Sequence, residues 1–205
     1  MKKERIKTFT TAITAGKHKG KKIEIPNIAT TRSSKSIVKE SLFNTLQFEI
    51  IDKNFVEVFA GSGSIGLEAL SRGAKECYFI EYNKTAFTYL QENTRRIDPL
   101  KSHLIYGDSF EKFSIVYEMI KKSREKTYFY FDPPFFTRKG MDDIYDKTIT
   151  LIKTIEAAVC QMVIIEHIST LNMPDKIGTL SQIKQKKFGK STISYYMPKE
   201  QQECA

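Results

Sequence analysis

Residues 132–135, Asp132-Pro133-Pro134-Phe135, are the part of the sequence whose residue types most clearly suggest chemistry. They follow an aromatic run, Y-F-Y-F, that is typical of a buried strand in a parallel sheet. Ligands bind at the carboxyl ends of such strands, and two consecutive prolines hold the turn rigid. The Asp132 carboxylate and the Pro133 carbonyl could accept both hydrogens of an exocyclic amine, while Phe135 stacks on its ring. The pattern therefore favours alkylation of a nucleobase amine.

A glycine-rich turn, G-S-G-S-I-G at residues 61–66, lies upstream of this stretch. The apolar run before it predicts a buried strand, and the pattern after it predicts a helix. Glycines at 61, 63 and 66 allow positive φ angles and a close approach of the backbone to a ligand. The helix start is expected to offer unpaired N–H groups, so this turn predicts a ligand-binding site.

Two acidic residues complete the pattern at the ends of the next two predicted strands. Glu81 stands twenty positions after Gly61, where a carboxylate could accept hydrogen bonds from both ribose hydroxyls of a nucleoside. Asp108 could accept from an adenine amino group, and it could equally cap the helix that follows. The glycine turn and the two acidic residues together predict a cofactor that contains a nucleoside.

Two cofactors fit these residues. The turn satisfies the dinucleotide fingerprint G-x-G-x-x-G, so an NAD-linked oxidoreductase stays open, although the fourth strand and its turn supply no obvious acid or base for hydride chemistry. S-adenosylmethionine fits better, since its sulfonium methyl transfers in line without a metal. No metal site is expected, because His18, His103 and His167 lie far apart and none pairs with a cysteine.

The predicted elements that must position these residues alternate between strand and helix, which indicates one α/β domain with a small appendage. A final pair of strands without an intervening helix predicts an antiparallel hairpin at the sheet edge. Strands are expected at 55–59, 76–80, 103–106, 127–131, 162–165, 178–187 and 191–197, and helices at about 36–49, 65–72, 85–96, 110–122 and 141–157.

The basic residues are concentrated at the N-terminus. Residues 1–40 carry eleven Lys or Arg against three Asp or Glu, and this net +8 accounts for nearly all of the chain's formal charge of +9. A hairpin is expected between residues 11 and 26, with a lysine-rich loop that could follow a phosphate backbone. A solvated basic tail is the simpler alternative. Concentrated basic charge points to a polyanion, either nucleic acid or an acidic membrane surface. If the polyanion is RNA, the residues expected to bind it are Lys17, Lys19, Lys21, Lys22, Arg32, Lys35 and Lys39.

The cysteines and the apolar segments bear on the compartment. Cys77, Cys160 and Cys204 lack metal-ligand or C-x-x-C spacing, and a reducing cytoplasm is the simplest expectation. The first residues carry positive charge without an apolar run, and no stretch of about 18 apolar residues occurs. We therefore expect a cytoplasmic protein without a membrane partner, and a monomer.

Several motifs resemble those of the bacterial 16S rRNA guanine-N2 methyltransferases. They are E-V-F-A-G-S-G-S-I-G-L-E-A-L-S-R-G-A, F-I-E and F-D-P-P-F, together with A-G-K-H-K-G-K-K-I-E-I-P and T-R-S-S-K-S-I-V-K-E-S-L-F-N upstream and V-I-I-E-H and K-F-G-K-S-T-I-S-Y-Y downstream. The resemblance covers about residues 15–197. Its upstream motifs are the specific ones, because D-P-P-F also occurs in adenine- and cytosine-modifying enzymes.

The resemblance implies a Rossmann-like class I methyltransferase fold. Its sheet would have seven mostly parallel strands with an antiparallel C-terminal hairpin and a small N-terminal β-hairpin extension, divided into residues 1–35 and 36–205. The cofactor would be S-adenosylmethionine, and Asp132, Pro133, Pro134 and Phe135 would be catalytic. Residues expected to bind the cofactor are Glu57, Gly61, Ser62, Gly63, Glu81, Tyr82, Asp108 and Ser109.

The sequence departs from the family pattern at two places. Glu57 stands where the family usually has Asp, and its extra methylene could still reach the methionine amine. Residues 32–38 read R-S-S-K-S-I-V where the family usually reads R-P-T-T-D-R-V, which leaves the role of this segment open.

The resemblance implies methylation of a guanine N2 amine in small-subunit rRNA, either free or in an assembly particle. The base would be flipped into the pocket around Asp132. An adenine N6 methyltransferase acting on DNA or RNA is the nearest alternative. Two further alternatives are an NAD-linked oxidoreductase and a cofactor-binding module that holds RNA without catalysis.

Overall fold

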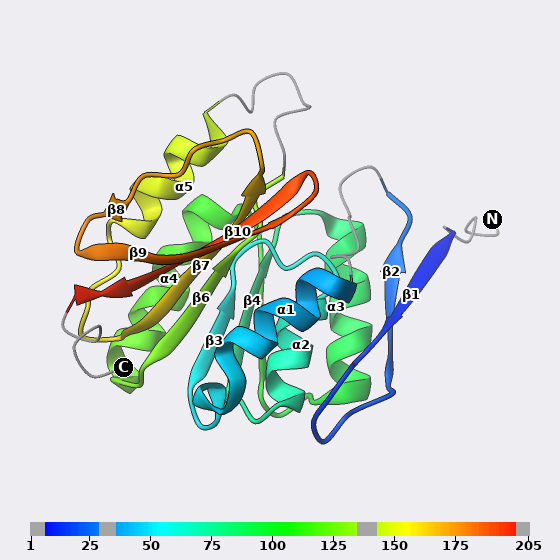
Figure 1. Ribbon diagram of the computed structural model, residues 1–205. Helices are drawn as coiled ribbons and strands as arrows, with labels where there is room; N and C mark the ends of the chain where they lie inside the picture. Colours follow the sequence, from blue (N-terminus) through cyan, green and yellow to red (C-terminus); the bar gives the residue numbers. More distant parts are fainter. Residues whose placement is uncertain (1–6, 29–35, 135–142, 200–205) are drawn as a thin grey trace.

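The computed structural model describes residues 7–28, 36–134 and 143–199. A central sheet carries helices on both faces, and a separate two-stranded hairpin lies beside one of these helices (Figure 1). Helices α1 (Ser36–Leu46), α2 (Ser64–Ser71) and α3 (Lys84–Ile97) pack on one face. Helices α4 (Ser109–Ser123) and α5 (Ile144–Ile152) pack on the other. A 3-10 turn, η1 (Gln47–Ile50), follows α1.

The sheet has the strand order β5-β4-β3-β6-β7-β10-β9-β8. Its first five strands in this order are parallel, and β10, β9 and β8 continue it in antiparallel pairing. The bounds are β3 (Asn54–Glu57), β4 (Cys77–Glu81), β5 (Ser102–Tyr106), β6 (Thr127–Phe131), β7 (Cys160–Ile168), β8 (Lys176–Ile177), β9 (Leu180–Phe188) and β10 (Ser191–Pro198).

The parallel strands are buried on both faces, which explains their continuous apolar sequences. Tyr128 and Tyr130 contribute to the core beneath α1, α2 and α3, while Phe129 and Phe131 between them contribute to the core beneath α4 and α5. Every residue of β6 is buried. The aromatic run of residues 128–131 therefore fixes the centre of the sheet.

The predicted α/β fold with an antiparallel C-terminal hairpin is confirmed, and several of its details differ. An eighth strand, β8, is present because Gly178 adopts a φ of 59° and turns the chain between β8 and β9. The last helix is shorter than residues 141–157. The helix expected to reach residue 49 ends at Leu46, where Gln47 takes a φ of 44° and the 3-10 turn begins.

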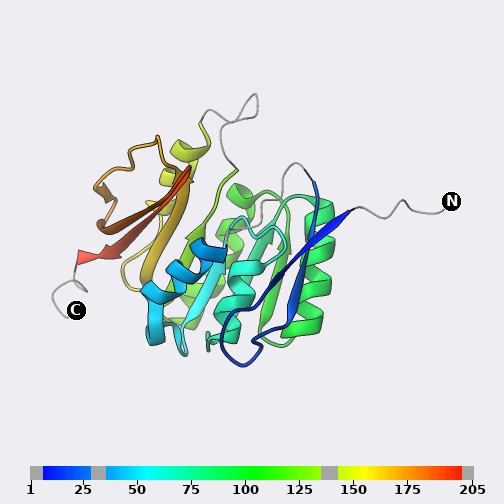
Figure 2. The same ribbon diagram turned by 45° about the vertical axis from the view of Figure 1, so that its right-hand side comes forward.

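The N-terminal hairpin consists of β1 (Thr8–Ala12) and β2 (Lys22–Pro26), and β2 lies beside α3 (Figure 2). Its first strand begins at Thr8, earlier than expected. Ile13 and Ile23 are part of the core beneath α1 to α3, so the hairpin shares the core of the main domain. The predicted division after residue 35 falls in the segment outside the described residues and stays a prediction.

The described residues contain neither a membrane-spanning helix nor a cluster of side chains suited to a metal ion. None of the helices in residues 7–28, 36–134 and 143–199 is long and apolar enough to cross a bilayer. In the same ranges, no group of three or more His, Cys, Asp or Glu side chains could hold a metal ion.

Candidate active site

The predicted site lies where the strand order of the parallel sheet reverses. From β3 the chain proceeds outward through β4 and β5, and it then returns to the other side of β3 through β6 and β7. Such a reversal leaves a crevice outside the carboxyl ends of the two central strands, which is where open α/β sheets bind ligands. The glycine turn follows β3 and Asp132 follows β6, so both predicted stretches flank this crevice.

The glycine turn has the backbone conformations that the sequence predicts at two of its three glycines. Gly61 and Gly63 have φ angles of 55° and 81°. A Cβ on Gly63 would lie 2.5 Å from Leu90 Cδ1. Gly66 differs, because it lies within α2 and a Cβ there would meet Phe79 Cε1 at 2.4 Å. Gly66 therefore serves close helix–strand packing, and the positive φ angle expected at this position is absent.

Glu81 connects the glycine turn to the end of β4. Its carboxylate accepts hydrogen bonds from the Gly61 N–H and the Asn83 N–H, both at 2.6 Å. Burial raises the pKa of Glu81, while these N–H donors oppose the rise. The carboxylate thus stands against the cofactor turn, as the twenty-residue spacing predicts for a group that accepts from ribose hydroxyls.

Glu57 is the last residue of β3, and its side chain reaches the start of α2. Its buried carboxylate accepts from the Gly66 N–H at 2.8 Å and from the Ile65 N–H at 3.4 Å, and burial raises its pKa to about 8. The expectation of unpaired N–H groups here is therefore wrong. A dinucleotide places its pyrophosphate on such N–H groups. The Glu57 carboxyl group fills that position, which disfavours NAD.

Three further residues predicted to bind the cofactor lie near the same edge. Asp108 Oδ1 accepts from the Phe110 N–H at 2.8 Å, so the helix-capping role considered for Asp108 is confirmed. The buried Ser109 hydroxyl donates to the Val58 carbonyl at 2.6 Å and ties the start of α4 to the segment after β3. Tyr82 is 69% exposed, which leaves its ring available to a ligand.

Asp132 and Pro133 continue directly from β6, with Asp132 partly exposed and Pro133 buried. Phe131 pairs with Ile165 in the parallel register of β6 and β7, so Asp132 and Glu166 are the next residues on the two strands. Pro134 is partly exposed. Phe135 lies outside the described residues, and its predicted stacking role stays a prediction.

Glu166 is a candidate site residue that the sequence reasoning missed. It is 6% exposed, and its Oε2 accepts a hydrogen bond of 2.8 Å from the Tyr130 hydroxyl. Burial, together with the negative charges of Glu166 and Asp132, raises the pKa of Tyr130. An acidic residue at the end of an apolar strand is the signal that identified Glu81, and it could have identified Glu166.

Asn93 of α3 is a second missed residue, fully buried, that joins the hairpin to the glycine turn. Its Nδ2 donates to the Ser62 carbonyl at 3.0 Å and to the Glu24 carbonyl at 2.9 Å. Its Oδ1 accepts from the Glu24 N–H at 3.0 Å. One amide therefore satisfies backbone groups of β2 and of the predicted cofactor turn, and it holds the two segments together.

Replacement of Asn93 by leucine is expected to lower the free energy of unfolding by about 3 kcal/mol. The similar volume leaves little cavity, but three backbone groups lose their partner, at roughly 1–3 kcal/mol for each unsatisfied group. The hydrogen bond to the Ser62 carbonyl is buried, and the two to Glu24 are partly buried. Chemical denaturation measures this loss. Gln91→Leu is the matched control on the exposed face of the same helix. Equal stabilities of the two variants would contradict the bridging role.

Lys39 was expected on the polar face of its helix, and this expectation is wrong. Lys39 is 1% exposed, its Nζ lies 3.2 Å from Glu68 Oε2, and it donates to the Ala12 carbonyl at 2.7 Å. Glu68 also accepts from Thr14 and from Arg72. Because a buried charge requires partners, Lys39 serves to attach the hairpin to α2 and does not face RNA.

The lysine-rich loop of the hairpin docks at the opposite end of α2 from the glycine turn. Lys17 N–H donates to the Ser71 carbonyl at 2.8 Å, and Lys17 Nζ pairs with Asp98 at 2.6 Å. Ser71 ends α2 and Asp98 follows α3, whereas both helices begin at the predicted site. At 1.5 Å per residue, the length of α3 places Asp98 roughly 20 Å from that edge.

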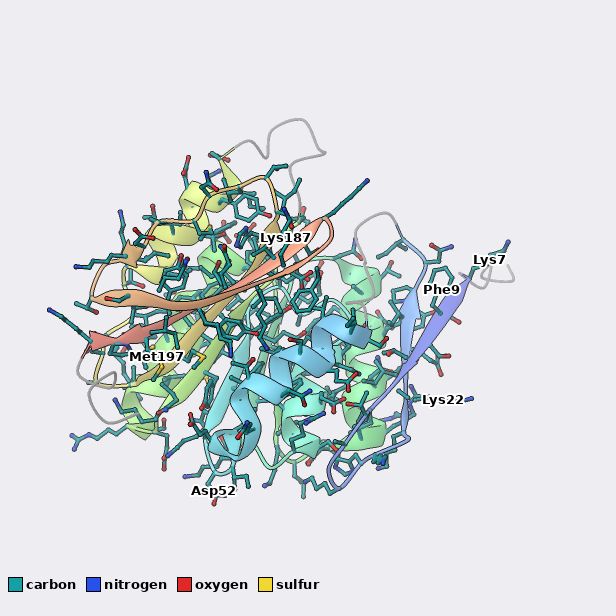
Figure 3. All side chains as sticks on the ribbon, viewed as in Figure 1. Lys7, Phe9, Lys22, Asp52, Lys187 and Met197 are labelled. Atoms are coloured by element: carbon teal, nitrogen blue, oxygen red, sulfur yellow. The ribbon has the colours of Figure 1, made fainter. Side chains whose placement is uncertain are left out.

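The other lysines expected to bind RNA share this location or lie outside the described residues. Lys21 Nζ donates to the Arg96 carbonyl at 3.4 Å, and Lys19 and Lys22 are exposed. Figure 3 places Lys22 low on the hairpin, well away from Lys187. Arg32 and Lys35 fall in the segment that the structure does not describe. The RNA-binding roles of Lys17, Lys19, Lys21 and Lys22 stay predictions.

Comparison with known proteins places the chain in a family. Residues 11–197 match the family model named conserved hypothetical protein 95. The chain belongs to this family. The ribosomal RNA small subunit methyltransferase D of Buchnera aphidicola subsp. Baizongia pistaciae is 30% identical over 200 residues, which are 95% of each chain. The enzyme of the same name from Haemophilus influenzae is 35% identical over 126 residues, 60% of this chain and 63% of that one.

A solved structure confirms the fold. The Escherichia coli methyltransferase candidate yhhF superposes with a TM-score of 0.72 at 22% identity and covers 93% of this chain and 98% of its own. The predicted class I methyltransferase fold is therefore correct, and so is the resemblance drawn from the motifs. This family member places its glycine turn, Glu81 and Asp132 on one edge of the sheet.

Proposed function

We propose that the protein is an S-adenosylmethionine-dependent rRNA methyltransferase and that it methylates the N2 amine of a guanine in small-subunit rRNA. Family membership and the names of its relatives support methylation of rRNA. The choice of guanine rests on one observation, the position of Glu166 beside Asp132.

The residues around the glycine turn fit the proposed cofactor. Glu81 is positioned to accept from ribose hydroxyls, Gly61 and Gly63 allow close approach of the backbone, and Asp108 lies at the edge where an adenine would bind. When bound, S-adenosylmethionine supplies an electrophilic methyl group on a positively charged sulfur. The Glu57 carboxyl group lies beside this turn with a pKa that burial raises to about 8, and a cationic ligand next to it would favour its ionised form.

Asp132 and Pro133 would bind the reacting amine. The Asp132 carboxylate and the Pro133 carbonyl each accept one hydrogen of the amine, which turns its nitrogen lone pair toward the methyl donor. Positive charge grows on this nitrogen as the new bond forms, so the two acceptors stabilise the transition state more than the ground state. The carboxylate is then in place to receive the proton that the amine loses.

Glu166 supports guanine as the base. Guanine carries hydrogens on both N1 and the N2 amine, whereas adenine N1 carries none and is an acceptor. A carboxylate next to Asp132 can accept from guanine N1–H, and it would repel the N1 lone pair of adenine. The Tyr130 hydroxyl fixes this carboxylate at the end of β7. Adenine N6 methylation therefore remains the less favoured alternative.

RNA in which guanosine is replaced by inosine tests this proposal, because inosine lacks only the N2 amine. Purified protein, labelled S-adenosylmethionine and small-subunit rRNA are expected to give labelled guanosine, and the inosine RNA is expected to give none. Labelling of inosine RNA at the same level would reject the N2 amine as the acceptor. Labelled adenosine in both RNAs would establish the alternative.

A further inference from the structure

We propose that the turn end of the β9–β10 hairpin binds the RNA phosphates next to the target nucleotide, through Lys187 and Lys190. This inference rests on the proposed function, since it assigns a surface to the same RNA substrate. It replaces the lysine-rich loop of the N-terminal hairpin as the main contact close to the reaction.

The position of the turn is fixed by the strand register. Lys187 pairs with Thr192 of β10, which pairs with His167 of β7, the residue after Glu166. Ser169 N–H donates to the Lys190 carbonyl at 2.9 Å. The turn between β9 and β10 therefore lies at the same edge of the sheet as Asp132, and Figure 3 shows Lys187 near this end.

The distance suits an RNA strand whose base enters the site. Three strand spacings of about 4.8 Å separate β9 from β6, so Lys187 lies roughly 15 Å across the sheet from the end of β6. A base flipped into the pocket at Asp132 leaves its neighbours on the protein surface. Their phosphates could reach the hairpin turn, whereas the Lys17 loop is too far away at the opposite edge.

The β9–β10 hairpin carries positive charges that no described acidic residue neutralises. Lys184, Lys187 and Lys190 are exposed, and none forms an ion pair with a described residue. Lys186 beside them donates to Ser41 and Thr45, and burial and repulsion from Lys184 lower its pKa. By contrast, Lys17 is neutralised by Asp98. A polyanion is the partner that such a surface fits.

Edge protection is the alternative role for these lysines. The outer edge of β9 beyond the β8 pairing carries no strand partner in the described chain, and lysines on exposed edges prevent unwanted strand pairing. Glutamate would protect the edge equally well and would repel RNA. Charge reversal therefore separates the two roles.

The test compares Lys187→Glu/Lys190→Glu with two other double variants of equal charge change. Lys101→Glu/Lys122→Glu is the matched control, with both lysines exposed near the opposite edge, and Lys19→Glu/Lys22→Glu tests the N-terminal loop. RNA affinity is measured against salt concentration with a small-subunit rRNA fragment. We expect a loss of at least tenfold for the Lys187/Lys190 variant and a salt slope smaller by about 1.4, or 0.7 for each lost phosphate contact.

Equal affinity of the Lys187/Lys190 variant and wild type would overturn the inference, as would a larger loss in the Lys19/Lys22 variant. If the charge-reversed protein does not fold, Lys187→Ala/Lys190→Ala is measured, with an expected loss of at least threefold, and an unchanged affinity overturns the inference. Nucleoside analysis of the wild-type product separates the two proposals. Labelled adenosine would reject guanine methylation without affecting the phosphate contact, whereas labelled guanosine with unchanged affinity of the variant would reject only the contact.

Discussion

Asp132→Ala is expected to reduce the rate of methyl transfer by about 10²–10³-fold while cofactor affinity stays within about twofold of wild type. Removal of one preorganised group that stabilises developing charge typically has an effect of this size. Asp132 follows β6, whereas the glycine turn and Glu81 follow β3 and β4 on the other side of the point where the strand order reverses. The alanine variant therefore leaves the predicted cofactor contacts in place.

Single-turnover kinetics with labelled S-adenosylmethionine measure the rate, and calorimetry measures the affinity. Asp146→Ala, an exposed carboxylate in the first turn of α5, is the control and is expected to react at the wild-type rate. A fully active Asp132→Ala protein would show that this carboxylate does not bind the amine. A variant that lost cofactor affinity instead would assign Asp132 to the cofactor.

Glu81→Ala is expected to weaken S-adenosylmethionine binding by about 10²–10⁴-fold. Hydrogen bonds to a charged group contribute about 1.5–3 kcal/mol each, and the carboxylate is expected to make two with the ribose. The substitution also removes the acceptor of the Gly61 N–H, which loosens the turn. Both effects act on the same binding step.

Calorimetric titration of wild type and variant with S-adenosylmethionine and with NAD measures this effect. Glu92→Ala, an exposed carboxylate on α3, is the control and is expected to bind like wild type. Tight binding of NAD without binding of S-adenosylmethionine would contradict the cofactor assignment. Undiminished binding by Glu81→Ala would remove Glu81 from the cofactor site.

Residues that obey local rules were predictable from the sequence. The aromatic run of residues 128–131 is buried on both faces as a central parallel strand must be. Gly61 and Gly63 have positive φ angles because the tight turn after β3 requires them. Glu81 lies against Gly61 because parallel strands place their carboxyl ends on one edge.

Residues whose roles depend on distant contacts were not predictable. The sequence pattern places Lys39 on the exposed face of a helix. In the fold, Lys39 is buried between Ala12 of the hairpin and Glu68 of α2. The lysine-rich loop looks like a phosphate-binding turn, yet tertiary contacts with Ser71 and Asp98 place it at the opposite edge. The sequence shows Glu166 near the end of an apolar strand, but its place beside Asp132 depends on the register of β6 and β7.

Nucleoside analysis of small-subunit rRNA tests the central claim most directly. The rRNA from cells that lack the protein is compared with rRNA from the same cells carrying the wild-type chain or the Asp132→Ala variant. We predict that one N2-methylguanosine is lost without the protein, returns with the wild type and does not return with the variant. An unchanged N2-methylguanosine content together with a lost N6-methyladenosine would contradict the claim.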